Sequence, residues 1–125
     1  MKWMALFAEA QKGSFEEGVE IYTPIELLHL FGHPPEDARG MVLAIQALHY
    51  NHPLLFFRVK EEGFSAPDYR AGLHWLEQKG PLHLRGVFAP GVGSLEILNP
   101  LFQFSQKQKV PLLTTEQDFF DFICS

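Results

Sequence analysis

The residues best suited to hold a ligand lie in a short glycine loop, Pro90-Gly91-Val92-Gly93-Ser94. Glycine lets the backbone approach a bound molecule, and the Ser94 hydroxyl adds a hydrogen-bonding group. The loop leads into a predicted helix, whose first backbone N–H groups attract anions. It lacks the third glycine of a dinucleotide fingerprint and the Gly-Lys-Ser/Thr of a Walker loop. We predict that Gly91, Gly93 and Ser94 contact a small anionic ligand; the alternative is a tight strand-to-helix turn.

Two further residues extend this candidate site. Thr114 ends a later predicted strand, and Arg58 lies near the end of a buried one. The carboxyl ends of parallel strands meet at one edge of a sheet, where open α/β proteins bind their ligands. A guanidinium there would suit a phosphate or a carboxylate. The alternative is that Arg58 only reaches water or pairs with Glu61, Glu62 or a neighbouring loop.

No motif in the sequence specifies catalysis or a metal. His-Glu-x-x-His, Cys-x-x-Cys and Gly-x-Ser-x-Gly are all absent, although the chain has six histidines. Glu61 and Glu62 are adjacent, so on a strand they would face opposite sides and make a poor acid–base pair. We predict no metal and no cofactor, and the sequence leaves open whether the protein is an enzyme.

Phenylalanine is unusually common, with 12 residues among 125. Five of them fall in the last two predicted helices: Phe102, Phe104, Phe119, Phe120 and Phe122. An exposed aromatic patch marks a partner surface, whereas a buried one is simply core. We predict that Phe104 and Phe120 contact a protein partner or a second copy of the chain, with a Phe-rich core as the alternative.

Charge and hydropathy exclude several classes of protein. The net charge is −5, and the nearest thing to a basic run is Lys107-Gln108-Lys109, so we predict no nucleic-acid binding. No apolar run reaches the roughly 18 residues of a membrane helix, so we predict no membrane association. The single cysteine, Cys124, cannot form an internal disulfide, which favours a reducing compartment and a cytoplasmic location.

The elements that position these residues alternate along the chain. We predict strands at 2–9, 19–22, 54–60, 82–89 and 110–114. Capping patterns predict helix starts at Thr23, Ser65 and Thr115, and the acids Glu36 and Asp37 predict another. Pro100 would disrupt a helix that began at Ser94, so we predict one turn over 94–98 and a main helix from Asn99-Pro100; the alternative is a helix kinked at Pro100.

This alternation of strands and helices predicts a single α/β domain over residues 1–125. Strand–helix–strand units form parallel sheets covered by helices on both faces. We therefore expect a three-layer sandwich with a mainly parallel sheet of about five strands. The two N-terminal strands are placed to form a hairpin, which would add an antiparallel edge.

The stretch 84–93, with its glycine loop, a following helix and then the strand Val110-Pro111-Leu112-Leu113-Thr114-Thr115, resembles the end of small regulatory α/β modules of the DRTGG type. The resemblance implies a non-catalytic sensory or regulatory role. With the absence of catalytic motifs, it favours a non-enzymatic binding or regulatory domain that acts through protein contacts or self-association. The alternative is an enzyme or sensor that binds a small anionic ligand at the carboxyl ends of the strands.

Overall fold

A computed structural model describes residues 3–79 and 83–124 of the chain. Its elements, in chain order, are β1 (Trp3–Glu9), β2 (Val19–Ile21), α1 (Pro24–Phe31), α2 (Gly40–His49), β3 (Leu54–Val59), α3 (Ala66–Gln78), β4 (Leu84–Phe88), α4 (Leu95–Gln108), β5 (Leu112–Leu113) and α5 (Glu116–Ile123). The predicted strands thus recur with nearly the same bounds. Residues 2 and 82, the predicted first residues of two strands, lie outside the described ranges.

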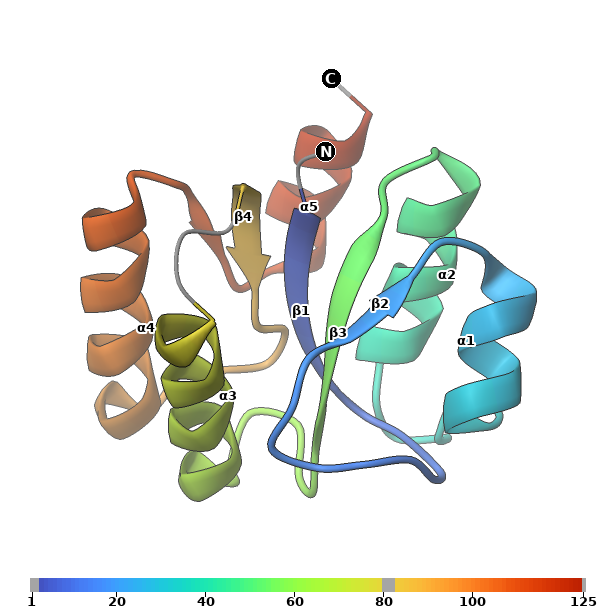
Figure 1. Ribbon diagram of the computed structural model, residues 1–125, viewed down its shortest axis with the longest axis horizontal. Coiled ribbons are helices and arrows are strands. Elements are labelled where there is room, and N and C mark those ends of the chain that lie inside the picture. The colour runs from blue at the N-terminus through green and yellow to red at the C-terminus, as the bar shows by residue number, and fades with distance from the viewer. Residues whose placement is uncertain (1–2, 80–82, 125) are drawn as a thin grey trace.

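The strands form one sheet in the order β2-β3-β1-β4-β5, in which only β2 runs antiparallel to its neighbour (Figure 1). The predicted α/β fold with a mainly parallel sheet is therefore confirmed, including its antiparallel edge. The predicted hairpin is wrong, because β2 pairs with β3, Val19 opposite Phe56. The reason is topological: β1 has β3 on one side and β4 on the other, so it has no free edge for β2.

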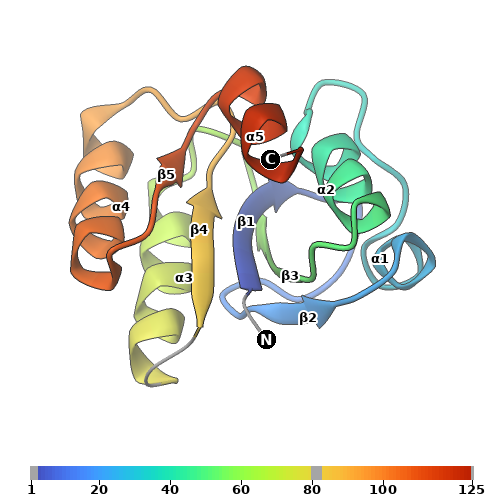
Figure 2. The same cartoon turned by 90° about the horizontal axis from the view of Figure 1, so that it is seen from above.

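Helices cover both faces of the sheet, which gives the predicted three layers (Figure 2). Successive residues of a strand point to opposite faces. Leu6 of β1 accordingly belongs to the core under α1, α2 and α5, whereas Phe7 belongs to the core under α3 and α4. None of the helices in the described part of the chain is long and apolar enough to cross a membrane.

Local capping explains two helix starts. The Thr23 hydroxyl accepts the Glu26 N–H at 3.2 Å, and the Thr115 hydroxyl accepts the Asp118 N–H at 3.2 Å, as predicted. Ser65 makes no such cap, because its hydroxyl instead accepts the Glu61 N–H at 3.1 Å.

The predicted start of α2 at Glu36 and Asp37 is wrong. This helix begins only at Gly40, and the residue before it, Arg39, supplies no side-chain cap. The N-terminus of α2 therefore needs an acceptor from elsewhere in the chain.

The prediction that the main helix begins at Asn99-Pro100 is also wrong. One continuous helix, α4, runs from Leu95 to Gln108 with Pro100 inside it. Ile97, Leu101 and Phe104 are all buried on one face, at positions i, i+4 and i+7. Their burial across Pro100 offsets the missing backbone donor, which costs roughly 3 kcal/mol in a helix interior.

The two predicted interface residues occupy different environments. Phe104 is only 5% exposed and belongs to the core beneath α3 and α4, which leaves it almost no surface to offer a partner. Phe120 is half-buried and packs against the other core. Phe102, two positions before Phe104, is 53% exposed.

The difference in burial between Phe104 and Phe102, both on α4, can be tested by replacing each with alanine. We expect F104A to lower the free energy of unfolding by about 3–5 kcal/mol, the usual cost of removing a buried phenyl ring. F102A should change it by no more than about 0.5 kcal/mol, as for most exposed positions. Urea denaturation followed by circular dichroism measures both. Equal losses would show that Phe102 also belongs to the core.

Candidate functional site

A cavity of about 500 Å³ lies at the carboxyl edge of the sheet. Its lining comes from the carboxyl ends of the four parallel strands, the segments that follow them and the turn before α2: Glu9 at the end of β1; Glu61, Glu62 and Phe64 after β3; Pro90 and Gly91 after β4; Thr114 and Glu116 after β5; Asp37 and Arg39 before α2. The sheet grows outward from β1 in both directions, toward β3 and toward β4. The cavity therefore occupies the position where open α/β sheets bind ligands.

The lining is strongly acidic. Among the residues described as lining the cavity, five are carboxylates and one, Arg39, is a cation. Carboxylates close to one another repel a further negative charge. The small anionic ligand expected from the sequence therefore does not suit this cavity; a positively charged group does.

Glu62 is the carboxylate that shapes the cavity wall. Its Oε1 accepts the Glu9 N–H at 3.1 Å, and its Oε2 accepts the Arg39 N–H at 3.0 Å. The Gly40 N–H lies 3.2 Å from Oε1 and 3.1 Å from Oε2. Glu62 thus supplies the missing acceptor at the N-terminus of α2, where a negative charge also suits the helix dipole.

The Glu9 side chain makes the reciprocal hydrogen bond to Glu62. Its Oε1 accepts the Glu62 N–H at 3.0 Å. The ends of β1 and β3 are therefore joined by two reciprocal bonds, each from a backbone N–H to the other residue's carboxylate. Both carboxylates are partly buried, so their orientation is set by the backbone and not by solvent.

Burial raises the pKa of the Glu62 carboxyl above its ordinary value, and the Glu9 carboxylate acts in the same direction. The three backbone N–H groups oppose this shift because they stabilise the charged form. The net direction shows that loss of solvent outweighs these bonds.

The loop after β3 is held in place by the start of α3. Asp68 Oδ2 accepts the Lys60 N–H at 2.8 Å, and the Tyr69 hydroxyl accepts the Gly63 N–H at 2.7 Å. Burial raises the pKa of Tyr69, which keeps its hydroxyl neutral. Gly63 has a φ of +87°, and a Cβ there would lie 2.5 Å from the Gly91 carbonyl oxygen. The loops after β3 and β4 are therefore in direct contact.

Gly40 allows the close approach of α2 to the sheet. A Cβ at this position would lie 2.4 Å from the Ala8 Cβ and 2.4 Å from Glu62 Oε1. Any larger residue would push the helix away from its acceptor. The Glu62 cap therefore depends on glycine at position 40.

The ligand-site residues expected from the sequence are only partly brought together. Gly91 and Thr114 line the cavity, and the Gly91 N–H donates to the Thr114 carbonyl at 3.4 Å. Gly93 and Ser94 are exposed and are not among the residues that line it. Whether any of these residues binds a ligand stays a prediction.

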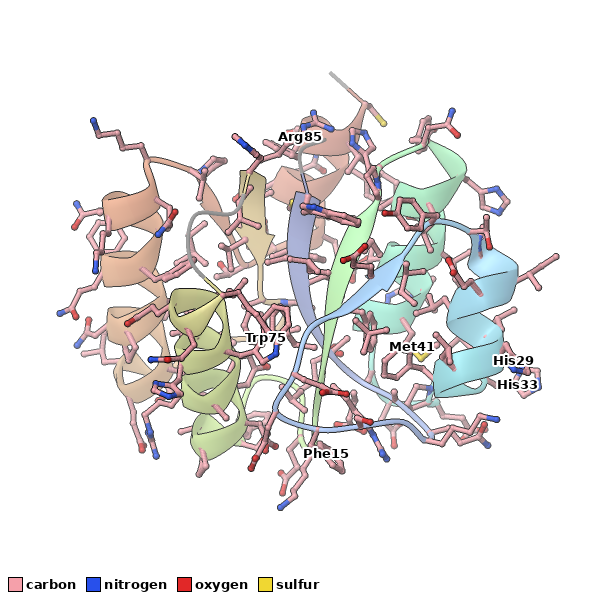
Figure 3. All side chains as sticks on the ribbon, viewed as in Figure 1. Phe15, His29, His33, Met41, Trp75 and Arg85 are labelled. Carbon is pink, nitrogen blue, oxygen red and sulfur yellow. The ribbon has the colours of Figure 1, made fainter. Side chains whose placement is uncertain are left out.

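Arg58 also lies apart from the cavity lining. Its guanidinium lies 4.2 Å from the centre of the Phe15 ring, and its NH1 donates to the Gly13 carbonyl at 2.7 Å. Phe15 is seen at the lower, carboxyl end of the sheet, opposite Arg85 (Figure 3). This matches the alternative in which Arg58 pairs with a neighbouring loop.

The site predicted from the sequence consists of glycines, hydroxyl groups and a cation, so it does not include the acidic lining. One signal was present: Glu9, Glu61 and Glu116 each stand close to the end of a predicted parallel strand. Acids repeated at strand ends predict a negative carboxyl edge. The part played by Glu62 could not be seen in this way, because it depends on a helix that begins 22 residues earlier.

The described residues, 3–79 and 83–124, contain no group of three or more His, Cys, Asp or Glu side chains arranged to hold a metal ion. Comparison of the chain with protein-family models, with curated proteins and with solved structures finds no match. The function must therefore be argued from the cavity itself.

The contact at Gly40 generates a first prediction for the site. Alanine in a helix is normally more favourable than glycine by about 1 kcal/mol. Here the clash should reverse the sign, so that G40A lowers the free energy of unfolding by about 1–3 kcal/mol. G93A is the matched control, because a Cβ there meets no described atom within 4 Å. Urea denaturation of both variants gives the comparison, and a stabilising G40A would show that α2 can shift without cost.

The raised pKa of Glu62 leads to a second prediction, on how stability changes with pH. In the folded protein Glu62 keeps its proton above the ordinary pKa of 4.5, where the unfolded chain has lost it. Its contribution to stability is therefore greatest below pH 4.5 and falls as the pH rises through the folded-state pKa. The melting temperature of the wild type minus that of E62Q should decrease as the pH rises from 4.5 through the pKa of Glu62 in the folded protein.

Differential scanning calorimetry at several pH values measures this difference. E77Q, which removes a carboxylate from α3 outside the acidic cavity, corrects for the loss of one charge. A difference that grew with pH would mean that the N–H bonds to Glu62 outweigh its burial.

Proposed function

We propose that this chain is a non-enzymatic binding domain and that a protein partner inserts a basic side chain, lysine or arginine, into the carboxyl-edge cavity. The observation that carries the proposal is the lining, with five carboxylates and one arginine. The cavity lies at the carboxyl edge of the sheet, where the strands extend from β1 in both directions. Fixed carboxylates of this kind attract an ammonium or guanidinium group and orient it by charge-assisted hydrogen bonds.

Exposed apolar side chains, one of them in the cavity lining, support a protein partner over a free small molecule. Phe64 belongs to the lining and is 74% exposed, and Leu95, at the start of α4, is 69% exposed. The N-terminal halves of α3 and α4 are joined by the Arg70–Glu96 ion pair at 3.3 Å. A charged pocket beside exposed apolar residues resembles the anatomy of protein interfaces, in which an aromatic anchor accompanies polar contacts.

The use of the carboxylates favours binding over catalysis. Both oxygens of Glu62 and Oε1 of Glu9 accept backbone N–H groups, so the arrangement of these carboxyl groups is structural. Glu116 is engaged by Arg39. The proposal includes a cytoplasmic, regulatory setting, which suits a chain with one cysteine. Self-association is its competitor, and the same experiment distinguishes the two.

The test is a titration of ¹⁵N-labelled protein, followed by NMR, with N-acetyl-arginine amide and N-acetyl-lysine amide. We expect saturable shifts at Glu62, Gly63 and Gly91 with a Kd of about 1–10 mM, as suits one side chain. N-acetyl-citrulline amide, which has nearly the same shape without the charge, should cause no saturable shift. E61Q should weaken binding about three- to tenfold, and the matched charge removal E77Q should weaken it less than twofold.

Two outcomes would contradict the proposal: equal binding of the citrulline compound, or shifts that do not centre on the cavity. A second arm distinguishes a protein partner from a free amine. The peptide acetyl-Leu-Arg-Leu-amide should bind more tightly than acetyl-Gly-Arg-Gly-amide, and F64A should remove the difference. Equal affinities in the wild type would point to a free cationic ligand. Native mass spectrometry showing a dimer that the peptides do not disturb would favour self-association.

A further inference from the structure

The only cation in the described lining is already paired. Arg39 Nε donates to Glu116 Oε2 at 3.2 Å, and Arg39 NH2 donates to Glu116 Oε1 at 3.1 Å. This is a two-point guanidinium–carboxylate pair, the geometry that holds an arginine most specifically. The hydrogen bonds and charge of Glu116 raise the pKa of Arg39 further. A basic group that entered the cavity would find Glu116 occupied by the chain's own arginine.

The pair connects two helices that cover different strands. Arg39 immediately precedes α2, which packs against β1. Glu116 is the first residue of α5, whose Phe119 stacks on Phe88 of β4 at a ring distance of 4.0 Å. Because β1 and β4 are neighbours in the sheet, the ion pair crosses the boundary between them at the carboxyl edge. Both residues also line the cavity.

The pair can open without disturbing the fold. The Arg39 and Glu116 side chains are 56% and 45% exposed. An exposed ion pair of this type favours its closed arrangement by no more than about fivefold. The Arg39 backbone N–H is held separately by Glu62, and the Glu116 backbone follows the Thr115 cap. Only the long Arg39 side chain has to swing into solvent.

From these contacts we propose that the Arg39–Glu116 pair is an autoinhibitory strap across the cavity, in which Arg39 competes with the partner's basic side chain for Glu116. This proposal rests on the function proposed above. When the partner's arginine or lysine binds, it takes the place of the Arg39 guanidinium on Glu116. The strap then lowers affinity for every basic ligand, and ligands able to replace both hydrogen bonds lose least.

The test compares two arginines in similar exposed ion pairs. R39Q opens the strap, whereas R70Q breaks the Arg70–Glu96 pair, whose side chains are 51% and 68% exposed. Both variants remove one positive charge, so general electrostatic attraction increases in both. We expect R39Q to bind N-acetyl-arginine amide about two- to fivefold more tightly than R70Q at the same ionic strength. R39K, which keeps the charge but loses the planar fork, should lie between R39Q and the wild type.

The possible results separate this proposal from the one on which it rests. Binding of R39Q that equals or falls below that of R70Q, in a protein whose wild type binds the probe at the cavity, would overturn the strap and leave the proposed function standing. No saturable binding by the wild type, R39Q or R70Q would overturn both. As a direct readout, the Arg39 Nε–H signal of the wild type should shift toward the position of a free arginine as the probe saturates. A signal that stayed unchanged at saturation would overturn displacement.

Discussion

The structure around the cavity depends on one partly buried acceptor, the Glu62 carboxylate. Helix α2 has no cap of its own, so its first N–H groups would be unpaired without Glu62. An unpaired buried donor costs about 1–3 kcal/mol, which makes this acceptor a condition for the position of the helix. The same carboxylate also binds the end of β1, and Glu9 completes the pair. One side chain thereby fixes the relative position of a helix and two central strands.

Much of the fold could be predicted because its determinants are local. The alternation of strands and helices requires only neighbouring residues, and the caps at Thr23 and Thr115 act over three positions. The wrong predictions about the fold concern features that depend on distant parts of the chain. The pairing of β2 with β3 depends on which edges of the sheet are already occupied, and the continuity of α4 through Pro100 depends on the core that it covers. Sequence periodicity contains neither kind of information.

The candidate site was harder to predict than the fold. Parallel topology predicted a site at the carboxyl edge, and a cavity lies there, lined by two of the expected residues, Gly91 and Thr114. Arg58 was expected to meet a ligand because it is a cation near a strand end. Its guanidinium instead lies against the Phe15 ring and bonds to the Gly13 carbonyl, in a loop whose path the sequence does not reveal. Residue type alone did not indicate the neighbours of Arg58.

The expected charge of the ligand also depends on neighbours that residue type does not reveal. A helix N-terminus at the carboxyl edge attracts an anion, which was the basis for predicting an anionic ligand. The same physical principle operates at α2, for which no ligand was predicted, but there the anion is part of the chain: Glu62 accepts the Arg39 and Gly40 N–H groups at the N-terminus. Once the backbone N–H groups are paired, what faces the cavity is the Glu62 carboxyl group and its acidic neighbours. An internal anion at the helix thus takes up the backbone donors that would otherwise attract an external anion.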